Sequence, residues 1–384
     1  MSTPKNIFKP SLYTDVWRPL SEARTLPRWC YTSQVFYDRE VERIFMRTWN
    51  FLDRTDAIPN AGDYITFDTF AGSIIVIRDG NGKIRAFANT CRHRGSRVLK
   101  GAGNCRAIVC PYHSWTYGLD GSLRGAKFMD KSTGFDMGKL GLKALRLETW
   151  GGFMFVNFDP DAESLMEYFG ELPDKFAGYK FTDMICTRRT SYKIRCNWKL
   201  LIENAHEDYH TPTVHRSSLG NQLTEPEESP VGNWDAIHLP LEHSVAVLPG
   251  EEARFPHIDG LQGKLKGGTY FTLLYPATQF ACVQDCMWWL RVMPEGPTHC
   301  SVNFGFCFPK STAARPNFAA EVEPYYRRWD IGIAEDNETG ELQQEGLASV
   351  LYEPGPMSWR EPKVQAIARW VLGRVLDEAT EGRA

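Results

Sequence analysis

Short apolar runs separated by turn residues fill residues 46–160. Two of these runs, at 73–77 and 84–87, flank the sequence Asp-Gly-Asn-Gly at 79–82, which strongly indicates a β-hairpin. A second tight turn and a further strand are indicated at 119–122 and 152–158. This pattern predicts a small antiparallel β domain.

The remainder of the chain mixes helical and strand patterns. A short amphipathic helix is predicted at 37–45. Apolar residues at helical spacing predict a longer helix at 362–376, which begins at Pro362, a residue suited to a first helical turn. Apolar strands are predicted at 269–275 and 300–306. Helices and strands are therefore both expected in this part of the chain.

The organisation along the 384 residues is that of two domains and an arm. Residues 1–45 are expected to form an N-terminal arm that packs with the second domain at 161–384. Within that domain the stretch 220–265, which is rich in Pro, Gly and Glu, is expected to be irregular and partly mobile.

Composition restricts the partners and the compartment. A net charge of −3 and a pI of about 6.3 provide no basic surface for nucleic acid or an anionic membrane, so we expect neither partner. No run of about 18 apolar residues and no signal-peptide core is present, so we expect a cytoplasmic protein. The ten cysteines are then expected to be thiols or metal ligands. Those in apolar or strand-like surroundings, typical of buried free cysteine, are Cys30, Cys186, Cys196, Cys282, Cys286, Cys300 and Cys307.

Two Cys/His pairs lie inside the predicted β domain. Cys91 and His93 form one pair, and Cys110 and His113 form the other. Two thiolates and two imidazoles suit either a tetrahedral Zn²⁺ or a [2Fe–2S] cluster in which two His replace two Cys on one iron. Zinc sites usually use Cys-x-x-Cys, whereas each loop here brings one Cys and one His. The spacing favours the cluster and leaves zinc as the alternative.

A second group of ligands lies at 197–215, which holds three histidines and three carboxylates in a mostly helix-compatible run. Two imidazoles and one carboxylate on one face of a metal form the site by which non-haem Fe(II) enzymes activate oxygen. His210 and His215 would point about 140° apart on a straight helix. We therefore predict that Pro212 breaks the helix between them. The alternative is a pair of partly buried imidazoles without a metal, and His206 is expected to be a surface or core residue.

The sequence Cys91-Arg92-His93-Arg94-Gly95 with Cys110-Pro111-Tyr112-His113-Ser114-Trp115 resembles the Rieske signature of the large (α) subunit of the Rieske non-haem iron oxygenases. The resemblance implies that Cys91 and Cys110 bind one iron and that His93 and His113 bind the other. The loops lack the additional cysteines of respiratory Rieske proteins, which favours the soluble oxygenase type. Cys105 matches no ligand position and is expected to be a plain thiol.

The segment 197–215 is similar to the catalytic-helix motif of the same oxygenases, in which the two histidines corresponding to His210 and His215 bind Fe(II). Residues 329–336 and 343–347 resemble the late segment that supplies the third ligand, which makes Asp336 that ligand. Independently, Asp336 shares the apolar face of Ile333 and Trp329, where a carboxylate needs a partner or a metal. Glu335 and Glu338 are alternatives. Asn204 is expected to lie near the iron, next to its ligands and without binding it.

By the same resemblance, Glu207 bridges His113 of one subunit to His210 of the next, with Asp208 as the alternative bridge. Most aromatic-ring dioxygenases have Asp at this place with different spacing. The Glu version looks more like carnitine or betaine monooxygenases.

The resemblance implies a terminal oxygenase with an α+β catalytic domain of the helix-grip type, in which a curved antiparallel sheet covers a long helix. It implies a homotrimer that uses O₂ and electrons from NAD(P)H, supplied by a reductase directly or through a ferredoxin. The expected reaction is hydroxylation of a small aromatic substrate. The alternatives are oxidative N- or O-demethylation, quaternary-ammonium oxidation, and electron transfer without oxygenase activity. No G-x-G-x-x-G is present, so the reductase is a separate chain. Aromatic candidates for the pocket or the core are Tyr270, Phe271, Tyr275, Phe280, Trp288 and Trp289.

Overall fold

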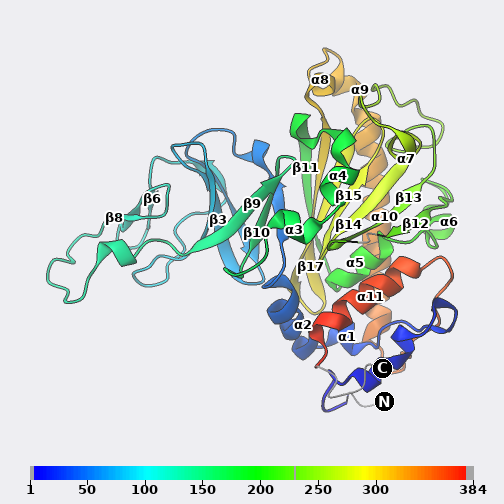
Figure 1. Ribbon diagram of the computed structural model, residues 1–384, viewed down its shortest axis with the longest axis horizontal. Helices are drawn as coiled ribbons and strands as arrows, with labels where there is room; N and C mark the ends of the chain where they lie inside the picture. The colour runs from blue at the N-terminus through cyan, green and yellow to red at the C-terminus, as the bar shows by residue number, and fades with distance from the viewer. Residues whose placement is uncertain (1–3, 229–230, 378–384) are drawn as a thin grey trace. The chain divides into compact units, whose positions relative to one another are not determined.

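In the computed structural model, which describes residues 4–228 and 231–377, the chain divides into two units (Figure 1). The smaller unit is Met46–Leu165, and the larger unit joins Met1–Phe45 to Met166–Ala384.

The smaller unit extends past position 160, where the sequence suggested a boundary. The indole Nε1 of Trp49 donates a hydrogen bond to the Glu163 carbonyl at 3.1 Å. The backbone N–H of Leu165 donates to Glu148 Oε2 at 2.9 Å. These contacts hold residues 163–165 to the smaller unit.

The smaller unit contains a seven-stranded sheet in the order β1-β10-β9-β4-β3-β2-β5 and a three-stranded sheet in the order β6-β7-β8. All of the strand pairs are antiparallel, which confirms the predicted β domain. The strands are β1 Asn50–Arg54, β2 Asp63–Thr69, β3 Gly72–Arg78, β4 Ile84–Ala88, β5 Ala102–Asn104, β6 Ile108–Val109, β7 Thr116–Tyr117, β8 Leu123–Gly125, β9 Ala144–Trp150 and β10 Phe153–Asn157.

The predicted hairpin is formed by β3 and β4. Asp79 holds its turn because Oδ1 accepts hydrogen bonds from the backbone N–H groups of Asn81 and Lys83, both at 2.9 Å. Gly82 has φ +81°, a left-handed conformation that glycine adopts without strain. The second predicted turn joins β7 to β8.

That second turn depends on Gly121, which has φ +83°. A Cβ at this position would lie 2.3 Å from the Phe87 ring. The turn is closed by Asp120, whose Oδ1 accepts from the Ser122 hydroxyl at 2.6 Å. We infer that the close approach of the turn to Phe87 requires glycine here.

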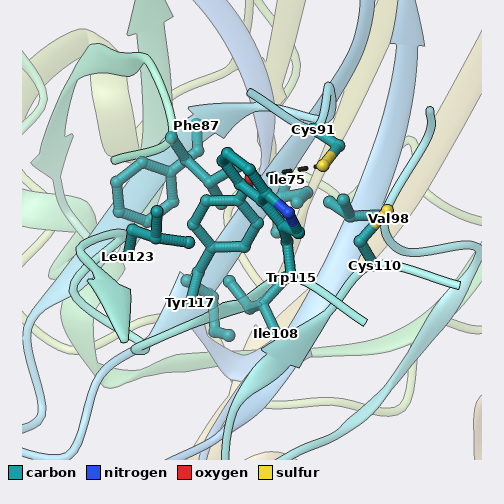
Figure 2. Packing of buried hydrophobic residues seen from close by; sticks show 11 residues of the cluster. Ile75, Phe87, Cys91, Val98, Ile108, Cys110, Trp115, Tyr117 and Leu123 are labelled. Atoms are coloured by element: carbon teal, nitrogen blue, oxygen red, sulfur yellow. Dashed lines mark hydrogen bonds between the residues drawn. The ribbon is translucent and has the colours of Figure 1, made fainter. Parts of the chain in front are cut away.

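The apolar run of β3 serves two cores. Ile75 and Ile77 face one cluster of buried side chains, and Ile74 and Val76 face another, because successive strand residues point to opposite faces. Figure 2 shows the group of buried side chains around Ile75 and Ile77, which includes the two cysteines predicted to bind the [2Fe–2S] cluster. Its members are Ile75, Ile77, Phe87, Cys91, Val98, Ile108, Cys110, Trp115, Tyr117, Leu123 and Leu142.

The larger unit is built on a second seven-stranded antiparallel sheet, in the order β11-β17-β16-β15-β14-β13-β12. The predicted strands at 269–275 and 300–306 are β14 and β17, so both are confirmed. The strands are β11 Met184–Ile194, β12 Glu225–Glu228, β13 Trp234–Leu239, β14 Thr269–Leu274, β15 Thr278–Cys282, β16 Met287–Gly296 and β17 His299–Pro309.

Helices pack on this sheet, and the longest of them, α10, contacts α5, α6 and β11. Figure 1 shows α5 and α11 next to each other at one end of the sheet. The predicted C-terminal helix is confirmed as α11. The helices are α1 Trp29–Thr32, α2 Gln34–Glu40, α3 Leu165–Phe169, α4 Leu172–Lys175, α5 Trp198–Asn204, α6 Thr211–Val214, α7 Gly263–Lys266, α8 Lys310–Ala313, α9 Phe318–Glu321, α10 Glu323–Ala348 and α11 Pro362–Val375. Among the described residues, none of the helices has the length and apolar character needed to span a membrane.

The stretch 220–265 is more regular than its composition suggested. It contains β12 and β13, which form one edge of the sheet, and the first residues of α7. The prediction of an irregular segment is wrong for these elements. Pro226 is tolerated in β12 because an edge strand has one side without strand partners. Residues 229–230 lie outside the described residues.

The arm is joined to α5 by a buried ion pair. The Lys199 ammonium lies 2.6 Å from Glu40 Oε1, and neither side chain is exposed to solvent. Trp198 Nε1 donates to the other oxygen of Glu40 at 3.1 Å. The predicted helix at 37–45 is therefore the end of α2, which begins at Gln34 and continues as a π-turn.

Titration of Glu203 is expected to lower the stability of the fold as the pH rises. Its carboxylate accepts a hydrogen bond from the Tyr31 hydroxyl at 2.9 Å. Burial raises the pKa of Glu203 from 4.5 to about 7, and the opposing effects of Lys199 and Tyr31 do not offset it. The folded state thus holds this proton more tightly than the unfolded state. The resulting stability is complete below pH 4.5 and is lost as the pH rises to about 7.

We expect Glu203→Gln to remove this loss. Between about pH 5 and about pH 8 the variant's free energy of unfolding should fall by about 2 kcal/mol less than that of the wild type. Urea unfolding at both pH values measures the difference. Glu22→Gln, at an exposed position of the arm, is the control and should behave as the wild type. An equal pH dependence in Glu203→Gln and wild type would contradict the expectation.

Candidate functional site

The segment 197–215 folds as α5, a bend at residues 205–210, and α6. The helix does not break between the two histidines, so the predicted role of Pro212 is wrong. Pro212 lies in the first turn of α6, where its missing N–H would have had no helical partner. The bend is instead stabilised by Glu207, whose Oε2 accepts from the backbone N–H groups of Tyr209 and His210.

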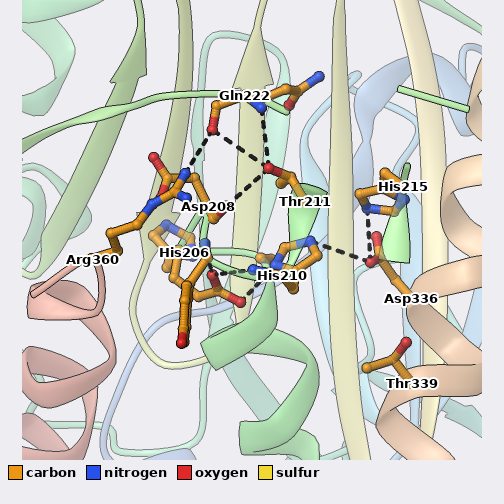
Figure 3. Close-up of polar contacts among 12 residues, drawn as sticks. His206, Asp208, His210, Thr211, His215, Gln222, Asp336, Thr339 and Arg360 are labelled. Carbon is orange, nitrogen blue, oxygen red and sulfur yellow. Dashed lines mark hydrogen bonds and ion pairs between the residues drawn. The ribbon is translucent and has the colours of Figure 1, made fainter. Parts of the chain in front are cut away.

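His210 and His215 flank α6 as its first and last cap residues. Their Nε2 atoms lie 3.6 Å and 3.1 Å from Oδ1 of Asp336, which comes from α10. Figure 3 shows the three side chains converging, and their ligand atoms all lie within 4.8 Å of one another. Asp336 Oδ1 is buried and makes no hydrogen bond of ordinary geometry to the described residues. This arrangement fits one metal ion with two imidazoles and one carboxylate.

The other ring nitrogens of the two histidines face carboxylates. His210 Nδ1 lies 2.5 Å from Glu207 Oε1, and His215 Nδ1 lies 2.7 Å from Glu335 Oε2. A carboxylate at Nδ1 keeps the proton there and leaves the Nε2 lone pair for a metal. Glu335, an alternative ligand from the sequence, therefore lies at the opposite edge of the His215 ring from Asp336. Glu338, the other alternative, is exposed.

Electrostatics around His215 also favour a cation. Burial lowers its pKa, but the neighbouring carboxylates of Asp336 and Glu335 outweigh burial, and the pKa is raised overall. In the absence of a metal, a proton would partly satisfy these carboxylates. Metal binding would displace it, since ligating histidine is neutral.

Asp208, the alternative bridge, faces away from His210. Its Oδ1 lies 2.5 Å from Arg360 Nε, and its Oδ2 accepts from the Thr224 hydroxyl at 2.9 Å. Asp208 is buried, and these contacts join the bend to the residues just before α11 and β12. His206 is a core residue, and burial lowers its pKa to about 3.

A cavity lies beside the three predicted ligands, and Asn204 and Glu207 also line it. Of the aromatic candidates, Phe271 and Trp288 line the cavity, whereas Tyr270 and Trp289 point to the opposite face of the sheet because strand neighbours alternate. Tyr275 and Phe280 are core residues as well. The cavity also has lining residues that were not predicted from the sequence, among them Leu201, Leu219, Ile237, Leu290, Val302, Phe304, Arg328 and Trp329.

The two Cys/His loops of the smaller unit have the same backbone pattern. Cys91 N donates to the carbonyl five residues later at 2.8 Å, and Cys110 N does so at 2.9 Å. In both loops the cysteine carbonyl accepts at 3.0 Å from the fourth following residue, Gly95 or Ser114, which has positive φ. Two matched loops thus present one thiol and one imidazole each.

The donor set fits a Rieske cluster. Both thiols are buried, whereas His93 and His113 are exposed and their ring centroids lie 4.7 Å apart. Burial raises the pKa of Cys110, but backbone N–H groups of Tyr112 and His113 outweigh it and the pKa is lowered, which favours the thiolate that iron requires. Burial instead raises the pKa of Cys105, which favours the thiol form, and the half-buried side chain packs against the core.

Comparisons with known proteins agree with both sites. Residues 48–145 match the family described as Rieske [2Fe-2S] domain, and residues 181–377 match that described as Ring hydroxylating alpha subunit (catalytic domain). The domain match favours the iron–sulfur cluster over the zinc alternative.

Relatives match most of the chain. The glycine betaine monooxygenase oxygenase subunit of Pseudomonas aeruginosa is 28% identical over 90% of this chain and 87% of its own length. The chloroplastic choline monooxygenase of Spinacia oleracea is 33% identical over 92% of this chain and 79% of its own. These proteins are named as monooxygenases, in agreement with the predicted class of enzyme.

A solved structure shares the fold. It is of a quaternary ammonium Rieske monooxygenase, with a TM-score of 0.79 and 23% identity over 94% of this chain and 97% of that chain. The predicted α+β fold, with a β Rieske domain and a helix-grip domain, is therefore confirmed. Both domain families match this chain, and a relative is 33% identical over 92% of its length. The chain therefore belongs to the Rieske non-haem iron oxygenases, as the terminal oxygenase (α) component.

Proposed function

We propose that this oxygenase is a monooxygenase of a quaternary ammonium compound rather than of an aromatic ring. The observation that carries the proposal is that relatives matching about nine-tenths of the chain are named for glycine betaine and choline. Glu207, which replaces the usual Asp of aromatic-ring enzymes, agrees with it. The indole of Trp288 and the ring of Phe271 offer π faces that attract an alkylammonium group in a desolvated cavity.

Asp336, His210 and His215 would hold Fe(II), and Cys91, Cys110, His93 and His113 would hold the cluster. Bound iron supplies the activation of O₂, the proposed co-substrate. The protein's own contribution is to keep protons on Nδ1 of both histidines through Glu207 and Glu335, and to surround the site with apolar side chains that exclude water.

Electrons would come from NAD(P)H through a separate reductase, directly or through a ferredoxin. Glu207 contacts His210 on the ring edge away from Asp336, and it also lines a second cavity on that side. The exposed His113 of another subunit is the proposed donor, within a homotrimer. The related quaternary ammonium monooxygenase is described as revealing inter-subunit electron transfer, which supports this route.

The test is O₂ uptake by the purified holoenzyme with a surrogate reductase and NADH. Glycine betaine, carnitine and choline are compared with naphthalene, with product identification by mass spectrometry. Oxygen insertion at an N-methyl carbon uses one O₂, two electrons and two protons, and it releases one water. The resulting hydroxymethyl group loses its hydroxyl proton and departs as formaldehyde, while the electrons of the broken C–N bond stay on the nitrogen. We expect coupled uptake and formaldehyde from at least one ammonium compound. Hydroxylated naphthalene, without turnover of the ammonium compounds, would favour the aromatic alternative.

A further inference from the structure

Arg328 is a buried cation without an ionic partner. It lies in α10 and is 2% exposed. Within residues 4–228 and 231–377 its guanidinium makes no hydrogen bond or ion pair, and its Nε atom is buried and unsatisfied. Its contacts are cation–π contacts with Trp329, at 3.8 Å to the ring centroid, and Trp288, at 5.7 Å. By contrast, the buried Lys199 and Lys363 each pair with a carboxylate.

Arg328 lines the cavity beside the predicted iron ligands. It also lines a neighbouring cavity under the 241–251 loop, and Leu219 and Gln222 belong to both. Arg328 thus stands where the two cavities meet. A buried guanidinium with unused donors is costly unless an anion pairs with it.

The side chain extends along α10 toward the ligand Asp336. An idealised Cβ on Gly332 would lie 3.7 Å from Arg328 Nη1, so the guanidinium lies beside this glycine. Gly332 is four residues before Asp336, which is about 6 Å along a helix axis. The cation is therefore about one helical turn from the predicted metal site.

Burial lowers the pKa of Arg328 to about 10, and the carboxylates of Asp336 and Glu335 oppose that effect. The guanidinium remains charged at neutral pH. The cavity therefore has a positive end at Arg328, an acidic end at Asp336 and Glu207, and the indole of Trp288 in its wall.

We propose that Arg328 determines specificity by binding a carboxylate of the substrate, so that the preferred substrate is a zwitterion with a carboxylate and a quaternary ammonium group. The carboxylate accepts hydrogen bonds from the guanidinium, and the methyl groups lie against Trp288 and Phe271 beside the metal ligands. This inference rests on the proposed ammonium specificity and separates two ligands within it: glycine betaine has the carboxylate, and choline has a hydroxyl in its place.

The test is calorimetric titration of the oxidised holoenzyme with glycine betaine, choline and benzoate. We expect the wild type to bind glycine betaine at least about 10-fold more tightly than choline, the scale of a charge-assisted hydrogen bond. Arg328→Met should weaken glycine betaine about 10- to 100-fold and change choline less than about 3-fold. Arg327→Met is the matched control, because this substitution removes the same charge from a neighbouring side chain that is 56% exposed. It should bind both ligands as the wild type does.

Measurable and equal affinity of the wild type for glycine betaine and choline would overturn the inference. An equal loss of both in Arg328→Met would also overturn it, because that is the result expected of a packing role. Failure of Arg328→Met to fold leaves the wild-type ligand comparison to decide. Benzoate separates this inference from the proposed function. Wild-type binding of benzoate but of neither ammonium compound, lost in Arg328→Met, would support the role of Arg328 and reject ammonium specificity. Binding of neither acid would overturn the inference.

Discussion

Asp336→Ala is expected to abolish turnover and remove one iron while leaving the Rieske cluster intact. Asp336 is the carboxylate shared by the Nε2 atoms of His210 and His215, at 3.6 Å and 3.1 Å. Without it, two imidazoles remain, and three protein ligands are the minimum of this type of site. Iron should fall from about three to about two atoms per chain, with about two sulfides retained. Turnover should be lost together with this iron, because the iron is the proposed site of O₂ activation.

Iron and acid-labile sulfide analysis, with the visible spectrum, measures this outcome. Glu338→Ala is the matched control, because Glu338 lies two residues further along α10 and is exposed. It should keep about three irons. Retention of the third iron in Asp336→Ala would mean that another carboxylate is the ligand, and Glu335→Ala would then be examined in the same way.

Glu207→Gln is expected to slow turnover about 10- to 100-fold without loss of the cluster. The amide keeps the size of the side chain but loses the charge that faces His210 Nδ1 at 2.5 Å. We expect the reductase to reduce the cluster at the wild-type rate. Reoxidation of the cluster in the presence of substrate and O₂ should be slow, and stopped-flow absorbance measures its rate. A normal reoxidation rate would remove Glu207 from the electron route.

Mixing two impaired chains tests whether that route crosses between subunits. Glu207→Gln chains have an intact cluster, and His113→Ala chains have an intact Glu207 but an incomplete cluster. Co-expressed in one oligomer, they should regain part of the wild-type activity, since the cluster of one chain can serve the neighbouring iron. Transfer within a single chain would give no recovery above either variant alone.

Local patterns were sufficient to predict several elements. The turn at 79–82, the cluster loops at 91–93 and 110–113, and the helix from Pro362 depend on neighbours in the sequence: a side chain closing its own turn, a ligand pair on one loop, apolar residues at helical spacing. Asp336 was predicted as the ligand from the family resemblance, and the apolar face it shares with Ile333 gave local support. These features need no knowledge of distant residues.

Other features depended on distant partners. Whether the helix bends at Pro212 or before it was decided by Glu207 and by the fit of proline to a first turn. Asp208 could not be assigned locally because its partner, Arg360, is far along the chain. The choice between Glu335 and Asp336 depended on which edge of the His215 ring each one reaches.

The chemistry of this oxygenase was thus encoded in short motifs, because metal ligands and turn residues act over a few positions. The shape and polarity of its cavity were decided by the fold. Alternation along β14 and β16 restricts which aromatic side chains can face the cavity. Only packing of the sheet against α10 brings Phe271, Trp288 and Arg328 together as lining residues of one cavity. Arg328 in particular carried no local mark of function: its importance follows from burial without a partner, which exists only once the chain has folded.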